Sequence, residues 1–246
     1  MYILSIDTTT KTAGVAVAED DHILVEMVLN RQQHHSLYIG PMIEQALTMA
    51  GISCRDLGLI AVTRGPGSFT GLRIGLAIAR TMAQVLQIPL VGVDTPDVLA
   101  YNLSGHGGLV CTVQDARKKE LYVAIYHSRT LGMERLEGPA VMTPQELLQR
   151  LKKYARPVLF VGDGVVPYRS VFAEGLGDKA IFCAHNYPRP SVLIHIALAR
   201  YLQGEVVSPL ELQPLYLRPS EAERNLAQRR AEESKKEKVV RVKGER

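Results

Sequence analysis

Hydrophobic and polar positions alternate near the start of the chain, a pattern that is typical of β-strands. It predicts an antiparallel meander of three strands, with the turn residues Asp20 and Asp21 between the second and the third. Helical spacing follows, and the chain then alternates between helix and strand. The elements predicted in this half are strands 2–7, 12–19, 22–29, 59–63 and 90–93, helices 36–50 and 70–86, and a short helix from Pro96 that Thr95 caps.

The second half repeats this order of elements after a glycine-rich stretch, 104–108, whose small polar residues break every periodicity. We expect the boundary between two lobes there. A capping box formed by Thr143 and Glu146 predicts the start of a helix. The elements predicted in this half are strands 109–113, 120–127, 135–142 and 158–161, and helices 144–154 and 191–202. The recurring order predicts two similar α/β lobes.

The charge of the chain is concentrated at its end. Of the 29 Lys and Arg, ten lie within 218–246 together with six of the 25 Asp and Glu, so 19 of each sign remain elsewhere. The net charge of +4 is therefore a property of a tail rather than of a basic face. We predict an N-terminal lobe over 1–103, a C-terminal lobe over 104–218 and a basic tail over 219–246. The tail is either a solvating extension that folding does not need or an arm that makes weak, salt-sensitive contacts with tRNA phosphates.

The composition is that of a globular protein, with 46% hydrophobic and 22% charged residues. No apolar run reaches the length of about 18 residues that a membrane span needs. The first residues lack the basic lead and cleavage site of a secretory signal, so we expect a cytoplasmic protein. The three cysteines, Cys54, Cys111 and Cys183, are odd in number and scattered, which argues against a disulfide framework and against a zinc site.

Two segments are candidates for chemistry in the first half. Asp7-Thr8-Thr9-Thr10 follows a strand, where an aspartate and hydroxyl groups can hold a hydrated metal or offer amide groups to a phosphate; the alternative is an ordinary turn. Residues 65–75 follow a strand and open a helix, so their amides suit an anion. Gly71 and Gly75 are four residues apart and equally allow close approach of another backbone. Both interpretations of 65–75 stay open.

The two helices predicted over 36–50 and 70–86 contain only three charged residues, Glu44, Arg73 and Arg80. Their apolar residues cover about half of each helix circumference, more than the stripe of roughly 100° that one sheet face covers. Either both helices are buried inside one domain, or they form a protein-binding face.

In the second half, Asp115 and Arg117 end the strand that opens the lobe, and Asp163 ends a later one. Ligands of α/β folds bind at such strand ends, although an ordinary turn explains them as well. No His-x-x-x-His pair and no G-x-S-x-G elbow occurs in the sequence, which leaves a helical metal site and a hydrolase nucleophile without support.

Four segments carry a family resemblance that spans about residues 1–218: Ile6-Asp7-Thr8-Thr9-Thr10, RGPGSFTGLRIG at 64–75, Asp115-Ala116-Arg117 and Pro214-Leu215-Tyr216-Leu217-Arg218. They are similar to the bacterial TsaB (YeaZ) family. The resemblance implies an α/β fold of the actin-like (Hsp70/sugar kinase) type, with two ribonuclease-H-like lobes. It also implies a non-catalytic role in forming N6-threonylcarbamoyladenosine (t6A) at position 37 of tRNAs that read ANN codons.

The implied partners are the catalytic paralogue TsaD, as a heterodimer, and the ATPase TsaE, with a homodimer when the chain is alone. Contact with tRNA is then indirect, through the complex, and no membrane is involved. TsaD holds its metal largely with a His-x-x-x-His helix, and Thr95 and Leu99 stand at the two histidine positions here. Because neither side chain binds iron or zinc as an imidazole does, we expect no catalytic residue and no metal.

The resemblance, together with the turns and helices above, assigns two sets of site residues. The expected nucleotide-binding set is Asp7, Thr8, Thr9, Asp115 and Arg117, although Thr9 replaces the glycine that actin-like ATPases have near phosphate. The expected partner interface is Tyr38, Met42, Phe69, Gly71, Arg73, Ile74, Gly75, Ile78 and Met82. We expect no cofactor of its own, with ATP or ADP at the partner interface left open. The alternative function is an actin-like ATP-dependent enzyme, or a peptidase, that acts by itself.

Overall fold

The computed structural model describes residues 1–31, 35–130 and 132–218. The chain divides into two units, Met1–Leu215 and Tyr216–Arg246, and the helices and strands named below all belong to the first. The tail predicted over 219–246 lies outside the described residues, and the predicted division into lobes and tail stays a prediction. None of the helices within the described ranges combines the length and the apolar character that crossing a membrane requires.

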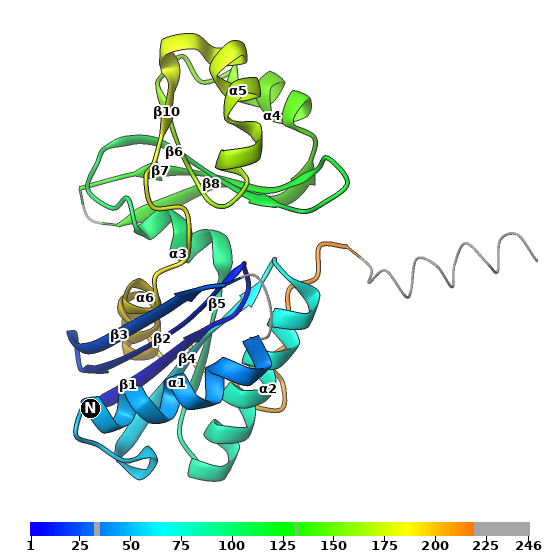
Figure 1. Ribbon diagram of the computed structural model, residues 1–246. Helices are drawn as coiled ribbons and strands as arrows, with labels where there is room; N and C mark the ends of the chain where they lie inside the picture. The colour runs from blue at the N-terminus through cyan, green and yellow to red at the C-terminus, as the bar shows by residue number, and fades with distance from the viewer. Residues whose placement is uncertain (32–34, 131, 219–246) are drawn as a thin grey trace, which may run out of the picture. The chain divides into compact units, whose positions relative to one another are not determined.

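Two five-stranded sheets of identical topology form the framework (Figure 1). In each, the first three strands are antiparallel neighbours and the last two join parallel to the first. The first sheet has the order β3-β2-β1-β4-β5, with β1 Tyr2–Asp7, β2 Thr12–Glu19, β3 His22–Asn30, β4 Leu57–Gly65 and β5 Leu90–Asp94. The second has the order β10-β9-β6-β7-β8, with β6 Gly108–Asp115, β7 Leu121–Ser128, β8 Met133–Met142, β9 Val158–Val161 and β10 Ala180–Phe182. The predicted fold class, two ribonuclease-H-like lobes of the actin-like type, is confirmed.

Helices cover both faces of the first sheet, as its alternating pattern requires. Along β1, Leu4 and Ile6 face the core under α1 (His35–Met49) and α2 (Phe69–Leu86). Ile3 faces the opposite core, where α6 (Pro190–Leu202) packs. Helix α6, the last one within the described residues, thus returns to the first sheet. We call this sheet with α1, α2 and α6 the first lobe.

The second sheet is covered on one face by α4 (Pro144–Leu151) and α5 (Val165–Leu176). We call the second sheet with these two helices the second lobe. Its other face packs on α3 (Thr95–Tyr101), the short helix between the lobes. Two 3-10 turns, Cys54–Asp56 and Gly177–Lys179, are the remaining helical elements in the part of the chain that the structure describes.

The helix ends follow local chemistry. The Ser68 hydroxyl accepts a hydrogen bond from the amide of Gly71 at the start of α2, and Gln87 ends that helix in the left-handed conformation. The predicted capping box of Thr143 and Glu146 is confirmed at the start of α4. The capping residue of α3 is Asp94 rather than Thr95, because the helix already includes Thr95.

Most of the predicted elements are present with ends that differ by a few residues, but α5 and β10 are absent from the prediction. Helix α5 buries only Val165 and Phe172, and its sequence contains Pro167 and Gly175. With so few inward positions, no helical stripe stands out against its surroundings. β10 has three residues and pairs only with β9, too short a segment for periodicity to detect.

Candidate functional site

The predicted candidate turn begins at Asp7, at the carboxyl end of β1, and Asp7 is completely enclosed. Its Oδ1 accepts hydrogen bonds from the hydroxyls of Thr63, at 2.6 Å, and Thr9, at 2.7 Å. Its Oδ2 is buried and has no partner among the described atoms. Burial raises the pKa of the Asp7 carboxyl, and the hydrogen bonds from Thr63 and Thr9 only partly oppose that rise. Thr63, which the sequence did not single out, belongs to this site because β1 and β4 are parallel neighbours.

The start of α2 lies directly on this turn. The Thr8 hydroxyl donates to the carbonyl oxygen of Gly71 at 2.7 Å, and the amide of Ser68 donates to the carbonyl oxygen of Thr9 at 2.7 Å. A Cβ at Gly67 would collide with the Thr9 carbonyl, and one at Gly71 with the Thr8 carbonyl. Gly67 and Gly71 therefore allow close packing. The backbone that approaches them is that of Thr8 and Thr9 in the same chain.

The same contacts decide how well the turn fits a nucleotide phosphate. Asp7, Thr8 and Thr9 are each only 1% exposed. A phosphate needs amide groups that it can reach, and here the first turn of α2 occupies the space above them. The turn as it stands does not fit a phosphate, and no ligand tests the predicted nucleotide-binding role of these three residues.

The corresponding turn of the second lobe, after β6, is open. The Asp115 carboxylate accepts from the amide of Arg117 at 2.8 Å, and the amide of Asp115 donates to Asp163 Oδ1 at 3.0 Å. Arg117, Lys118 and Lys119 are exposed and all have positive φ, between 53° and 62°. Burial raises the pKa of the Asp163 carboxyl. Asp115 and Arg117 are thus accessible and held by the turn, but no ligand tests their predicted role.

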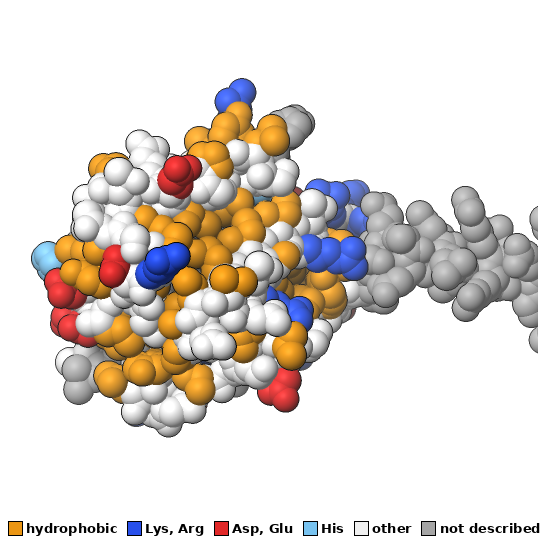
Figure 2. Space-filling view, turned by 90° about the horizontal axis from the view of Figure 1, so that it is seen from below, with side chains coloured by type: hydrophobic (Ala, Val, Ile, Leu, Met, Phe, Trp, Pro, Cys, Tyr) orange, Lys and Arg blue, Asp and Glu red, His pale blue; other side chains and the backbone are white. Residues whose placement is uncertain are grey.

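The predicted interface residues on α1 and α2 fall into two groups. Met42, Gly71 and Gly75 are buried in the chain's own core, so a partner on this face would meet the other six. Ile74, Ile78 and Met82 are half-buried against the core under the first sheet and follow one another at four-residue spacing along α2. Arg73 stacks over the ring of Phe69, with the guanidinium carbon 4.0 Å from the ring centroid. Figure 2 views the first lobe from below and shows hydrophobic side chains running across it with few charged ones between them.

Thr95 and Leu99, the two positions that the family resemblance sets against metal-binding histidines, lie on α3 and are closed to solvent. Thr95 and Leu99 are both 0% exposed, and Leu99 belongs to the core against the second sheet. The Thr95 hydroxyl has no hydrogen-bond partner among the described atoms. Within the ranges that the structure describes, no three His, Cys, Asp or Glu side chains come together as a metal site.

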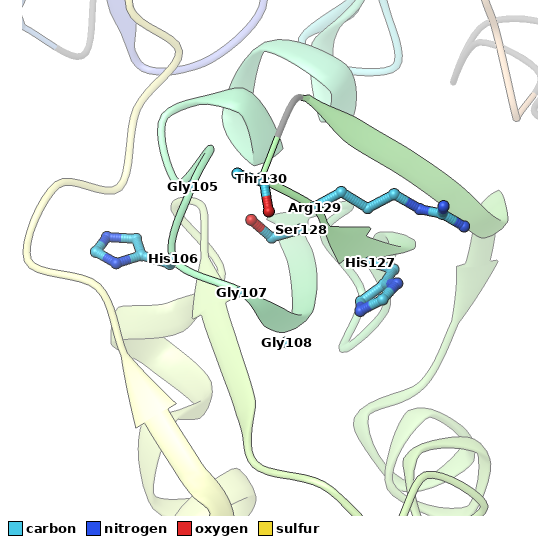
Figure 3. Close-up of a pocket in the computed structure, with 8 residues that line it drawn as sticks. All are labelled: Gly105, His106, Gly107, Gly108, His127, Ser128, Arg129 and Thr130. Atoms are coloured by element: carbon cyan, nitrogen blue, oxygen red, sulfur yellow. The ribbon is translucent and has the colours of Figure 1, made fainter.

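An open cavity of about 580 Å³, which the sequence did not predict as a site, lies between the glycine-rich loop and the end of the β7–β8 hairpin (Figure 3). It is lined by Gly105, His106, Gly107, Gly108, His127, Ser128, Arg129 and Thr130. Figure 3 shows the Arg129 side chain extending away from the other labelled side chains. Arg129 is bound to Glu134, which neutralises its charge. The Ser128 hydroxyl is buried and donates to the carbonyl oxygen of Leu103, so it is not free to bind a ligand in the cavity.

Comparison with known proteins finds relatives of this chain in one family of tRNA-modification proteins. The chain matches the family model described as TsaD, tRNA N6-adenosine threonylcarbamoyltransferase, over residues 22–226. It is 32% identical to the tRNA threonylcarbamoyladenosine biosynthesis protein TsaB of Bacillus subtilis, covering 91% of this chain and 96% of that one. The TsaB protein of Escherichia coli is 31% identical over 92% of this chain and 98% of its own length.

A solved structure resembles this chain over most of its length. YeaZ from Pseudomonas aeruginosa superposes with a TM-score of 0.77 at 25% sequence identity, over 88% of this chain and 99% of that one. On these similarities in sequence and fold, the chain belongs to the TsaB (YeaZ) family of tRNA threonylcarbamoyladenosine biosynthesis proteins.

Proposed function

We propose that this chain is a non-catalytic scaffold subunit in the formation of t6A at position 37 of tRNAs that read ANN codons. Its TsaB relatives are named for t6A biosynthesis. The buried residues Thr95 and Leu99, where the catalytic paralogue has histidines, support a role without metal chemistry. The closed turn at Thr8 and Thr9 supports a role without nucleotide hydrolysis in this lobe.

The partner that we propose for α1 and α2 is TsaD. The single observation that carries the proposal is that α2 has two separate apolar sides, one packed on the sheet and one on its flank. Its inward side consists of Gly71, Leu72, Gly75, Leu76, Ala79 and Ala83, which already fill the space against the sheet. Ile74, Ile78 and Met82 form a second apolar stripe on its flank, and Val85 at the end of that stripe is 74% exposed. A helix with one buried stripe and a second, accessible one is suited to packing against helices of another subunit.

The other parts of the proposal concern further partners of the chain. TsaE joins the TsaD complex, a homodimer uses the same helices when TsaD is absent, and tRNA is bound through the complex. ATP or ADP then binds at the partner interface rather than inside this chain, because the turn after β1 is covered. The complex works in the cytoplasm.

The rival function, an actin-like ATP-dependent enzyme or a peptidase acting alone, has less support. An ATPase of this architecture needs phosphate at the turn that α2 covers. An ATP-turnover assay and a peptide-hydrolysis assay on the purified chain separate the two proposals, because the scaffold proposal expects neither activity without TsaD and TsaE.

The test of the partner face uses two charge variants and a matched control on the same helix. Ile74→Glu and Met82→Glu place a carboxylate on the stripe, whereas Gln84→Glu places one on the exposed opposite flank. A desolvated, unpaired carboxylate costs about 3 kcal/mol, roughly a hundredfold in Kd. We expect calorimetry to show that loss of TsaD affinity for the two stripe variants and an unchanged affinity for Gln84→Glu.

Circular dichroism and gel filtration of each variant confirm folding before binding is compared. If Ile74→Glu and Met82→Glu fold and bind TsaD as the parent chain does, the interface lies elsewhere. If all three variants lose binding equally, the effect is general charge repulsion rather than a docked stripe.

A further inference from the structure

Two aspartates at the start of helix α3, the capping residue Asp94 and Asp97 in the first turn, are mostly enclosed, with side chains 7% and 8% exposed. Asp94, the capping residue, accepts a hydrogen bond from Arg64 Nε at 2.7 Å through Oδ1. Its Oδ2 accepts one from Arg135 Nη2 at 2.8 Å. Arg64 lies on β4 of the first lobe and Arg135 on β8 of the second. One carboxylate therefore bonds to both lobes at once.

Asp97 repeats this arrangement one helical turn later. Its Oδ1 accepts from the hydroxyl of Tyr126 at 2.8 Å and from Arg135 Nη2 at 2.5 Å, both on strands of the second sheet. Its Oδ2 accepts from Arg200 Nη2 at 2.9 Å. Arg200 lies on α6 in the first lobe and also donates to the carbonyl oxygen of Gly92 on β5, at 3.0 Å.

The apolar residues of α3 are divided between the lobes in the same way. Val98 belongs to the core of the first sheet, together with Val91 and Val93. The next residue, Leu99, belongs to the core of the second sheet. All six residues from Thr95 to Ala100 are buried. A shift of either lobe would therefore pull α3 out of contact with the other.

We propose that Asp94 and Asp97 lock the two lobes at a fixed angle, so that the chain presents its surfaces as one rigid body instead of opening and closing about α3. Arg135 is the central residue, because among the described residues of the second lobe it is the one that bonds to both carboxylates. Opening the lobes would separate Arg135 from two carboxylates whose side chains are only 7% and 8% exposed, and such a separation is unfavourable. This proposal concerns the chain alone and does not rest on the proposed function.

The test measures the distance between the lobes directly by pulsed electron paramagnetic resonance on the full chain. Cys54 is exposed in the first lobe and takes one spin label, and Ser170→Cys, on the exposed side of α5, takes the other. Cys183→Ser removes the remaining accessible thiol. Cys111 is buried, and burial raises the pKa of its thiol far above the usual range, so it stays unlabelled.

Arg135→Met is compared in this background with Arg129→Met. Both variants remove an arginine that is bound to carboxylates, but Arg129 bonds to Glu134 within the second lobe. After Arg135→Met each aspartate still keeps one arginine, Arg64 or Arg200, so no carboxylate is left alone. We expect one narrow distance distribution in the parent chain and in Arg129→Met, and a broader or shifted one in Arg135→Met.

Hydrogen exchange supplies a second readout. Losing a charged hydrogen-bond partner should lower the protection of α3 about tenfold in Arg135→Met, with α1 and α2 unchanged. A broad distribution in the parent chain would overturn the proposal, because the lobes would then move despite the ion pairs. The proposal would also be overturned if the distribution of distances between the spin labels stayed unchanged in both Arg135→Met and Asp97→Asn.

Discussion

The two lobes share one strand order, yet the turn after the first strand is closed in one and open in the other. In the first lobe Thr8 and Thr9 are buried under α2, whereas in the second Arg117 to Lys119 are exposed. The helix after the fourth strand accounts for the difference. Gly71 brings α2 onto the Thr8 carbonyl, while Gly162 brings the start of α5 onto the carbonyl of Val113, within β6 and before the turn.

Topology thus sets where a turn lies, but a few glycines decide whether that turn remains accessible. In the first lobe the covered turn leaves Asp7 with an enclosed carboxylate oxygen that has no described partner. In the second lobe the uncovered turn leaves three residues in the left-handed conformation. The first lobe therefore carries the free-energy cost of a buried, unpartnered oxygen, and the second carries the cost of left-handed backbone. Substitutions can measure each cost.

The largest effect is expected for Gly71→Ala in the first lobe. The added methyl group would meet the Thr8 carbonyl, which is backbone and cannot move aside. Overpacking of this kind costs about 3 kcal/mol, and the better helix propensity of alanine returns about 1 kcal/mol. We expect a net loss of about 2 kcal/mol in the free energy of unfolding, measured by urea denaturation.

The matched control is Gly40→Ala on α1, where a Cβ would meet nothing within 4 Å. Only helix propensity acts there, so we expect a gain of about 0.5–1 kcal/mol. Equal stability of the two variants would show that α2 does not rest on the turn.

The difference between the lobes also shows which features of the fold can be predicted from the sequence and which cannot. Alternation and capping predicted the two-lobe order, because those signals are local. The sequence left both an anion site and a close backbone approach open for the glycines of 65–75, and it could not name the approaching segment, since Thr8 and Gly71 are 63 residues apart. The ion pairs of Asp97 were missed for the same reason, because Arg135 and Arg200 are 38 and 103 residues away.

A smaller, pH-dependent effect is expected from Asp7→Asn. Burial raises the folded-state pKa of Asp7 above its ordinary value of 3.8, so the folded chain holds this proton more tightly than the unfolded chain does. The contribution of Asp7 to stability is therefore greatest in acid, and it falls as the pH rises from 3.8 through the folded-state pKa. The fall is at most about 1.4 kcal/mol per pH unit.

Asp7→Asn removes this dependence, so the difference in unfolding free energy between parent and variant should change in favour of the variant as the pH rises. The comparison in the second lobe is Asp163→Asn. The pKa of Asp163 is also raised by burial, but the carboxyl is more accessible and Lys11 opposes the shift. We expect a shallower change there, and an equal change in both variants would mean that the closed turn does not set the environment of Asp7.

The smallest effect is expected in the open turn of the second lobe, for Lys118→Gly. Lys118 has a φ of 53°, and the left-handed conformation costs a residue with a Cβ roughly 1 kcal/mol. Glycine removes that cost, but its greater freedom in the unfolded chain offsets about half of the gain. We expect the free energy of unfolding to rise by about 0.5 kcal/mol. Lys152→Gly is the control, because Lys152 is also exposed but has a φ of −59°, where glycine only loses entropy and should destabilise. If both variants lose stability equally, the left-handed turn holds no strain, and burial alone distinguishes the two lobes.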